Sequence, residues 1–151
     1  MRGPVPFLVF SIVLFGAAGC GDPSARWEAG GIYSISDGDG FGVVKILAID
    51  PGAVSVRIYR ETFPTRPASV DPSELSLGRI DDPEGYGIGH LPLSPRDFAL
   101  WFPVQLATVA VTDEELEGYR SWKESGGGIF DFDDASAYED EHLETADEVQ
   151  Q

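Results

Sequence analysis

Two apolar segments joined by a tight turn constrain the fold of this chain more than any other part of its sequence. Residues 41–49 (FGVVKILAI) and 54–59 (VSVRIY) are rich in β-branched and aromatic side chains, which favour strands. Between them, Pro51 and Gly52 occupy the central positions of a four-residue segment, as in a type II turn. The pattern predicts a β-hairpin, so the fold should be built around an antiparallel sheet.

Polar and apolar residues alternate in the second strand of this hairpin, whereas the first strand is apolar on both faces except at Lys45. Alternation indicates a sheet with one face in a core, and its absence indicates a central strand. Residues 31–36 (GIYSIS) predict a third strand, joined through the turn residues 37–40 (DGDG). In the second strand, the face toward the core is predicted to carry Val54, Val56 and Ile58. The opposite face is predicted to carry Ser55, Arg57 and Tyr59.

Three helix starts follow in the second half of the chain. Thr112, with Glu115 three residues later, forms a capping-box pattern, which predicts a helix over 113–125. Single helical turns are expected after Asp71 and Ser94, because each precedes a proline at the first helical position. Helical structure is therefore confined to short segments between or after the strands.

Together these segments predict a mostly β domain (β+α) at residues 27–130. A further strand is expected over 104–111 (VQLATVAV), so that about five short strands form either a small SH3-like barrel or a bent antiparallel sheet. One C-terminal helix should follow. The resemblance to SH3 domains lies in the size and in the order of a glycine–aromatic strand, a turn and a long bent strand. Such folds carry many binding functions, so the fold class does not identify one.

An apolar segment that ends on a single cysteine marks the N-terminus. A nine-residue apolar block at 7–15 follows Arg2, and small residues precede Cys20, the sole cysteine of 151 residues. The apolar segment 7–19 has thirteen residues, whereas a membrane-spanning helix needs about 20. Removal of residues 1–19 as a signal peptide is therefore expected.

The run Ala17-Ala18-Gly19-Cys20 resembles the lipobox of bacterial lipoproteins, in which a diacylglycerol is attached to the cysteine before cleavage directly ahead of it. Ala17 departs from the family, which usually has leucine or another larger aliphatic residue there. The resemblance implies a lipid anchor on Cys20, export to the periplasmic or outer-membrane face of a bacterial cell envelope, and a lipidated tether at 20–26. The alternative is an ordinary secretory signal that leaves a free thiol.

Acidic residues dominate the mature chain and gather at its C-terminus. Loss of the signal peptide leaves 9 basic and 26 acidic residues, a net charge of −17. This balance argues against a basic surface for nucleic acid or anionic lipid and favours cationic partners, such as a basic protein, or divalent ions. Residues 131–151 carry nine acids and no Lys or Arg, which predicts a disordered tail. Such a tail either binds a basic partner or calcium, or only keeps the chain soluble.

Sequence motifs of catalysis and metal binding do not occur: GxSxG, HExxH, CxxC and P-loop patterns are all missing. The candidate for acid–base chemistry is His90, expected in a loop, with Asp81 or Asp82. A hydrogen-bonded histidine and an exposed turn over 81–85 are the simpler interpretations of these residues. We therefore expect no enzymatic activity, no cofactor and no metal site.

Arginine and aromatic side chains offer candidate contacts for a protein partner. These candidates are Arg57, Tyr59 and Arg60, provided that Arg57 lies on the solvent face beside Tyr59. The alternative is that the arginines form salt bridges with acids close in sequence. Trp101 and Phe102 are assigned to the core.

The sequence thus predicts a lipid-anchored cell-envelope protein whose β-rich domain is a protein-interaction module. The alternative function is that of an immunity or inhibitor protein that neutralises a basic envelope toxin or enzyme, because an acidic domain attracts such a target. An adjacent toxin gene would distinguish the second class from the first.

Overall fold

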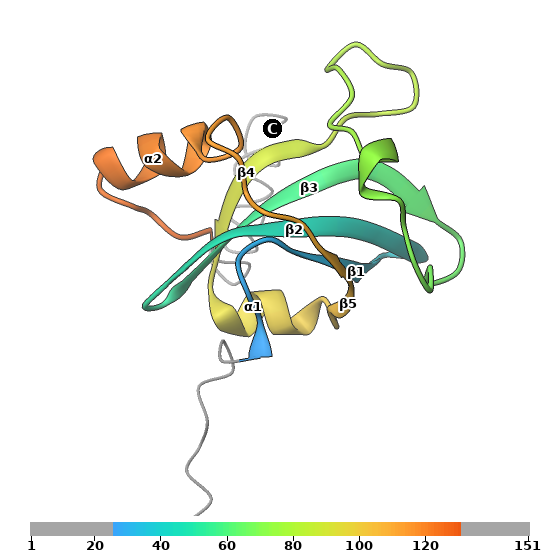
Figure 1. The fold of residues 1–151 in the computed structure, drawn as a ribbon, viewed down its shortest axis with the longest axis horizontal. Helices are drawn as coiled ribbons and strands as arrows, with labels where there is room; N and C mark the ends of the chain where they lie inside the picture. Colours follow the sequence, from blue (N-terminus) through green and yellow to red (C-terminus); the bar gives the residue numbers. More distant parts are fainter. Residues whose placement is uncertain (1–25, 131–151) are drawn as a thin grey trace, which may run out of the picture.

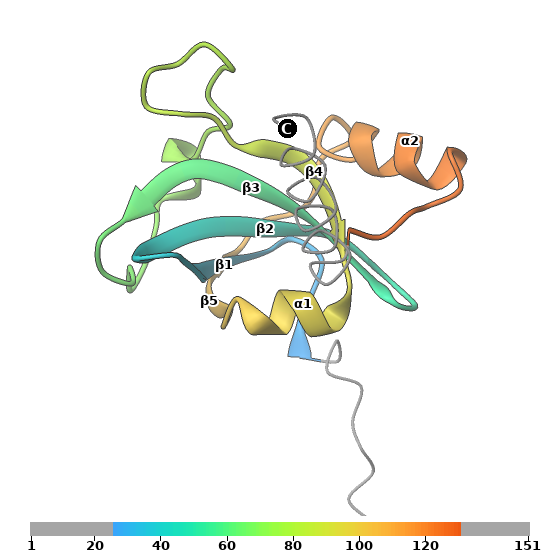
Figure 2. The same cartoon turned by 180° about the vertical axis from the view of Figure 1, so that it is seen from behind.

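A bent five-stranded antiparallel sheet forms the body of the computed structural model, which describes residues 26–130 (Figures 1 and 2). The predicted signal peptide, Cys20, most of the tether and the acidic tail lie outside the described residues. The strands, in the sheet order β4-β3-β2-β1-β5, are β1 (Gly31–Asp37), β2 (Gly40–Asp50), β3 (Ala53–Phe63), β4 (Ile88–Leu93) and β5 (Val104–Thr108). The helical segments are η2 (Pro72–Glu74, a 3-10 turn), α1 (Pro95–Leu100) and α2 (Glu117–Glu124).

The hairpin of β2 and β3 is the predicted one, and its turn has the expected geometry. Asp50 pairs with Ala53, and Gly52 has a φ of 82°, the positive value that a type II turn requires at its third position. β2 lies at the centre of the sheet, as its apolar residues on both faces predicted. β1 joins β2 through a two-residue turn, across which Asp37 pairs with Gly40.

Of the two predicted forms of the sheet, the open one is observed. β4 and β5 are its two edge strands, and within residues 26–130 they do not pair with each other. Register shifts interrupt the pairing of β1 with β5, of β2 with β3 and of β3 with β4. Bulges of this kind bend a strand and increase its twist. The predicted bent antiparallel sheet is therefore confirmed. The sheet does not close into an SH3-like barrel.

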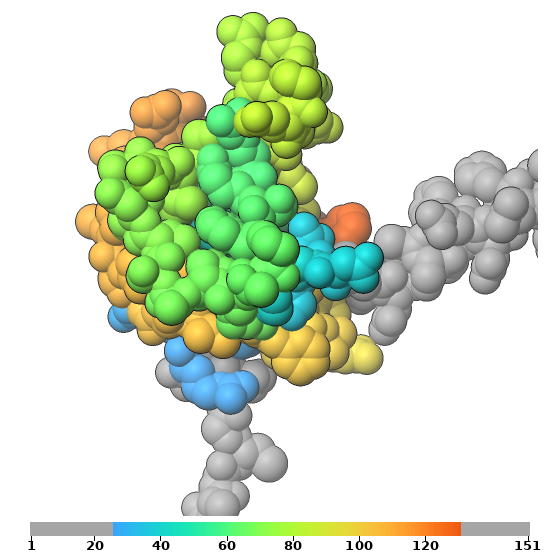
Figure 3. Space-filling model, turned by 90° about the vertical axis from the view of Figure 1, so that its right-hand side faces the viewer, coloured from blue at the N-terminus to red at the C-terminus, as the bar shows by residue number. Residues whose placement is uncertain are grey.

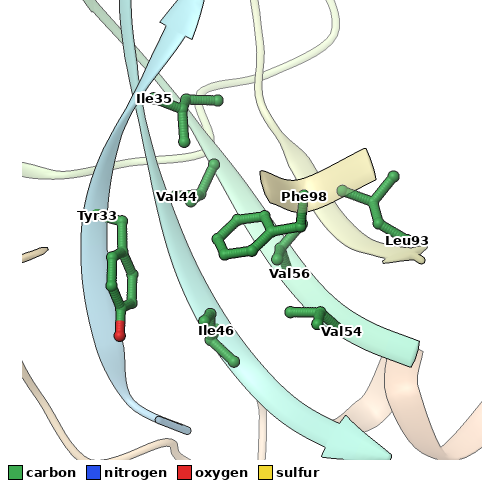
Figure 4. Packing of buried hydrophobic residues seen from close by; sticks show 8 residues of the cluster. All are labelled: Tyr33, Ile35, Val44, Ile46, Val54, Val56, Leu93 and Phe98. Carbon is green, nitrogen blue, oxygen red and sulfur yellow. The ribbon is translucent and has the colours of Figure 1, made fainter. Parts of the chain in front are cut away.

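One face of the sheet packs against α1 around Phe98, whose ring points from the helix toward the strands (Figure 4). Phe98 is fully buried, and its ring centroid lies 4.7 Å from that of Trp27 and 6.2 Å from that of Tyr33. Ser94 caps α1 by accepting a hydrogen bond from the backbone N–H of Asp97, as predicted. The other members of this core are Tyr33, Ile35, Val44, Ile46, Val54, Val56 and Leu93.

Trp101 and Phe102, both assigned to the core by the sequence, point in different directions. Trp101 packs on the core, with its ring centroid 6.1 Å from that of Phe98. Phe102 is 67% exposed, so its assignment to the core was wrong. The reason is the backbone of Phe102, which has a φ of 51° and reverses the direction of the chain between α1 and β5.

The opposite face of the sheet is also buried, which the alternating pattern of β3 did not predict. Ser34, Lys45 and Ser55 are at most 3% exposed. Segments that follow β3 and β5 cross this face. From the first segment, Arg66 Nη1 donates hydrogen bonds to the carbonyl and hydroxyl oxygens of Ser34, at 3.0 and 2.9 Å. From the second, the carbonyl of Ala110 accepts a hydrogen bond from Lys45 Nζ at 3.1 Å.

The C-terminal helix α2 is present but begins later than predicted. A helix over 113–125 was expected, and the residues before Glu117 form turns instead. The predicted capping box nevertheless forms, because the Glu115 N–H donates to Thr112 Oγ1 at 3.3 Å and the Thr112 N–H donates to Glu115 Oε2 at 2.9 Å. No helix within residues 26–130 is long and apolar enough to cross a membrane.

Candidate functional site

The predicted contact residues Arg57 and Tyr59 line a hollow of about 310 Å³ on the covered face of the sheet. β1, β2 and β3 supply its floor, which includes Lys45. The segments after β3 and after β5 supply its walls, including Pro72 and Glu115. The hollow therefore exists only because segments remote in sequence fold over the same part of the sheet.

Two cations and one carboxylate meet in this hollow. Lys45 Nζ lies 3.0 Å from Glu115 Oε1 and 2.8 Å from Glu115 Oε2, and Arg57 Nη1 lies 3.7 Å from Oε1. The side chains of Lys45 and Glu115 are only 3% and 11% exposed. Arg57 Nε is buried and has no hydrogen-bond partner within the described part of the chain. The exposed Glu114 also lines the hollow, so its two cations are matched by two carboxylates.

The surroundings hold Glu115 ionised and Tyr59 neutral. Burial alone would raise the pKa of Glu115, but hydrogen bonds from Lys45 and from the Thr112 backbone, together with the charges of Lys45 and Arg57, bring this pKa below its ordinary value. Burial raises the pKa of Tyr59, and the negative charge of Glu115 raises it further. At neutral pH the hollow therefore offers phenol and guanidinium donors that suit a carboxylate from outside.

Arg60, the third predicted contact residue, does not line this hollow. Its Nη1 donates to Asp82 Oδ2 at 3.1 Å, and its Nε donates to Glu61 Oε1 at 3.4 Å. Its backbone N–H also donates to the carbonyl of Ser76 at 3.0 Å. These contacts hold the segment before β4 against β3. The structure brings Arg57 and Tyr59 together and places Arg60 in local salt bridges.

The acid–base candidates of the sequence lie in separate places. Asp82 belongs to a turn before β4 and accepts a hydrogen bond from the backbone N–H of Arg79 at 2.8 Å. His90 lies within β4 rather than in a loop, and its Nε2 is 3.2 Å from the hydroxyl of Ser55. Because Ser55 is fully buried, this contact links two strands and does not present a nucleophile to solvent.

Besides its contact with Ser55, the ring of His90 lies next to aromatic residues of α2. The ring centroids of Tyr119 and Trp122 lie 6.2 and 5.8 Å from that of His90, and burial lowers the pKa of this histidine. Asp50 holds α2 in place by accepting hydrogen bonds from Tyr119 Oη at 2.9 Å and from Lys123 Nζ at 2.6 Å. The cluster therefore fastens α2 to the hairpin and to β4.

Sequence reasoning missed Lys45 and Glu115 as members of the site. Lys45 was seen only as an interruption of an apolar strand, and Glu115 only as a capping residue. A single charge in an otherwise buried strand is itself a signal, because a buried ammonium requires a charged partner. That signal predicts the existence of the partner, although not its identity.

The comparisons with known proteins give no relative for this arrangement. No family model, no curated protein and no solved structure matches the chain. Among residues 26–130, no group of three or more His, Cys, Asp or Glu side chains could hold a metal ion.

Proposed function

We propose that this chain is a lipid-anchored protein of the bacterial cell envelope and serves there as a protein-interaction module rather than as an enzyme. The observation that carries the proposal is the sole cysteine, Cys20, at the end of a lipobox-like signal. Cleavage ahead of Cys20 leaves a short segment before the described domain, which begins at Arg26. Two acyl chains on one cysteine anchor a soluble domain stably, since each buried methylene contributes about 0.8 kcal/mol.

The contact surface that we propose is the hollow of Arg57 and Tyr59. The guanidinium of Arg57, whose Nε has no hydrogen-bond partner among the described residues, favours a partner that inserts a carboxylate, from an acidic side chain or a chain terminus. Arginine and tyrosine are among the residues that dominate binding energy at protein interfaces. A carboxylate from a partner could lie closer to the Arg57 guanidinium than Glu115 does, since Glu115 Oε1 is 3.7 Å from Arg57 Nη1.

The alternative candidate, an immunity or inhibitor protein, draws on a different property of the chain. The net charge of −17 after signal cleavage would attract a basic toxin to the acidic surface as a whole. Such a complex would not depend on the Arg57 hollow, so a substitution there separates the two candidates.

Replacing Cys20 with serine is expected to abolish the incorporation of fatty acid, because the thioether that carries the lipid can no longer form. Labelled fatty acid should enter the wild type and not Cys20→Ser. Ser24→Ala, four residues further along the tether, is the matched control and should label like the wild type. Equal labelling of the wild type and Cys20→Ser would contradict lipid anchoring.

Replacing Arg57 with glutamine is expected to abolish capture of an acidic partner from envelope extract. Glutamine keeps a polar, hydrogen-bonding side chain but is shorter and removes the charge and the guanidinium fork. Arg120→Gln, in an exposed salt bridge of α2, is the control and should capture as the wild type does. Undiminished capture of a basic protein by Arg57→Gln would instead favour the immunity candidate.

A further inference from the structure

We propose that the corner formed by α1 and the start of β5 rests on the bilayer that holds the lipid anchor, an inference that depends on the proposed attachment at Cys20. Three apolar side chains are exposed at this corner: Leu100 by 57%, Phe102 by 67% and Val104 by 49%. They stand at alternate positions, at the end of α1, in the turn and at the start of β5. Side chains of this kind bury themselves at the boundary between lipid headgroups and acyl chains.

The start of the domain decides which side of the molecule faces the membrane. Trp27 packs edge-on against Phe98 of α1 at 4.7 Å, and Arg26 and Trp27 line a hollow of about 350 Å³ together with Phe102. The first described residues and α1 lie at the same end of the molecule (Figures 1 and 3). Cys20 precedes Arg26 by six residues, which span at most about 22 Å when fully extended. A lipid on Cys20 therefore keeps this corner close to the bilayer.

The charge of the corner also suits a membrane surface. Between residues 95 and 108 the sole acid is Asp97, which is 5% exposed, whereas the whole chain carries 26 acids. The exposed Glu28 is the acid beside this corner, and it is ionised, because hydrogen bonds from Thr108 at 2.7 Å and from Gln105 at 2.8 Å lower its pKa. An anionic lipid surface repels the remaining faces of the domain more strongly than this one. Repulsion and apolar contact thus favour the same orientation.

The backbone holds the ring of Phe102 outward. Its φ of 51° is a conformation that glycine adopts more readily than any aromatic residue. The Phe102 N–H donates to the carbonyl of Ala99 at 3.0 Å, and the Phe102 carbonyl accepts from Arg66 Nη1 at 3.1 Å. An exposed ring in this conformation adds no packing to the core, whereas on a bilayer it adds contact with lipid.

The test uses the full chain, lipidated on Cys20 in cells and reconstituted in vesicles of phosphatidylethanolamine and phosphatidylglycerol. Phe102→Cys carrying an NBD fluorophore should emit at a shorter wavelength and be quenched several-fold more by brominated lipid than Ile80→Cys carrying the same group. Ile80 is 81% exposed and belongs to the segment between η2 and β4, which projects from the opposite end of the molecule (Figure 3). Equal emission and quenching at the two positions would overturn the proposal.

A second variant removes the Phe102 ring without unfolding the domain. Phe102→Gly suits the positive φ, so its melting temperature should equal or exceed that of the wild type. With the fluorophore on Leu100→Cys, the added Phe102→Gly should lower the quenching by brominated lipid. Unchanged quenching would show that the ring makes no contact with the bilayer.

Failure of the lipid anchor is recognised separately, by the absence of fatty acid on Cys20. In that case, the labelled chains with Cys20→Ser and an N-terminal hexahistidine are held on vesicles that contain nickel-chelating lipid. The same difference between Phe102→Cys and Ile80→Cys is expected there. Equal emission and quenching at the two positions on these vesicles would overturn the proposal that the corner contacts the bilayer, whatever the natural anchor is.

Discussion

Replacing Glu115 with alanine is expected to lower the free energy of unfolding by about 3–5 kcal/mol, because the substitution leaves the ammonium of Lys45 buried without its counter-charge. Lys45 is 3% exposed and holds both oxygens of Glu115 within 3.0 Å. The carbonyl of Ala110 stays as its remaining hydrogen-bond acceptor, which solvates but does not neutralise the charge. Urea unfolding followed by tryptophan fluorescence measures the loss.

Two controls separate the buried charge from the helix cap. Glu114→Ala removes the neighbouring exposed carboxylate and should change stability by less than about 0.5 kcal/mol. Glu115→Gln keeps an acceptor for the Thr112 N–H but not the charge, and adding Lys45→Met should then recover most of the lost stability, since an apolar pair replaces a broken ion pair. A loss for Glu115→Ala no larger than that for Glu114→Ala would show that Lys45 needs no counter-charge.

The features that the sequence predicted well are those that depend on neighbouring residues. The turn at Pro51 and Gly52 is chosen by the preferred φ of these two residues, and the caps at Ser94 and Thr112 by hydrogen bonds that span three residues. The central position of β2 followed from its apolar residues on both faces. Local chemistry is sufficient in each case, so the prediction did not require the rest of the fold.

The features that it missed depend on segments far apart in sequence. Lys45 and Glu115 are 70 residues apart, and no period or motif links them. The burial of Ser34 and Ser55 on the second face of the sheet comes from remote residues, Arg66 for Ser34 and His90 for Ser55, that no local pattern pairs with these serines. Phe102 looked like a core residue because its type is usually buried, and only the backbone at this position turns it outward.

The two proposals place the membrane and the partner on different sides of the sheet. α1 packs on one face through Phe98, whereas the hollow of Arg57 lies on the opposite face, under the segments that follow β3 and β5. With the α1 corner on the bilayer, the sheet stands between the lipid and the hollow. A partner would then reach Arg57 from the envelope space without competing with the membrane.

Replacing Phe98 with alanine is expected to lower the free energy of unfolding by about 3–5 kcal/mol, the range for removing a large buried aromatic side chain. Phe98 is fully buried and is the contact through which α1, Trp27 and Trp101 join the sheet, so the vacated space cannot be filled by one neighbour alone. Phe102→Ala removes the same ring from an exposed position of the same corner and should change stability far less.

Thermal and urea unfolding of the two alanine variants, compared with the wild type, measure this difference. Phe98→Leu should lie between Phe98→Ala and the wild type, because leucine fills part of the cavity. Trp27 should also become more accessible to acrylamide in Phe98→Ala, since its edge-on contact is lost and the start of the domain is no longer held against α1. Similar stabilities for Phe98→Ala and Phe102→Ala would mean that α1 does not depend on this ring for its place on the sheet.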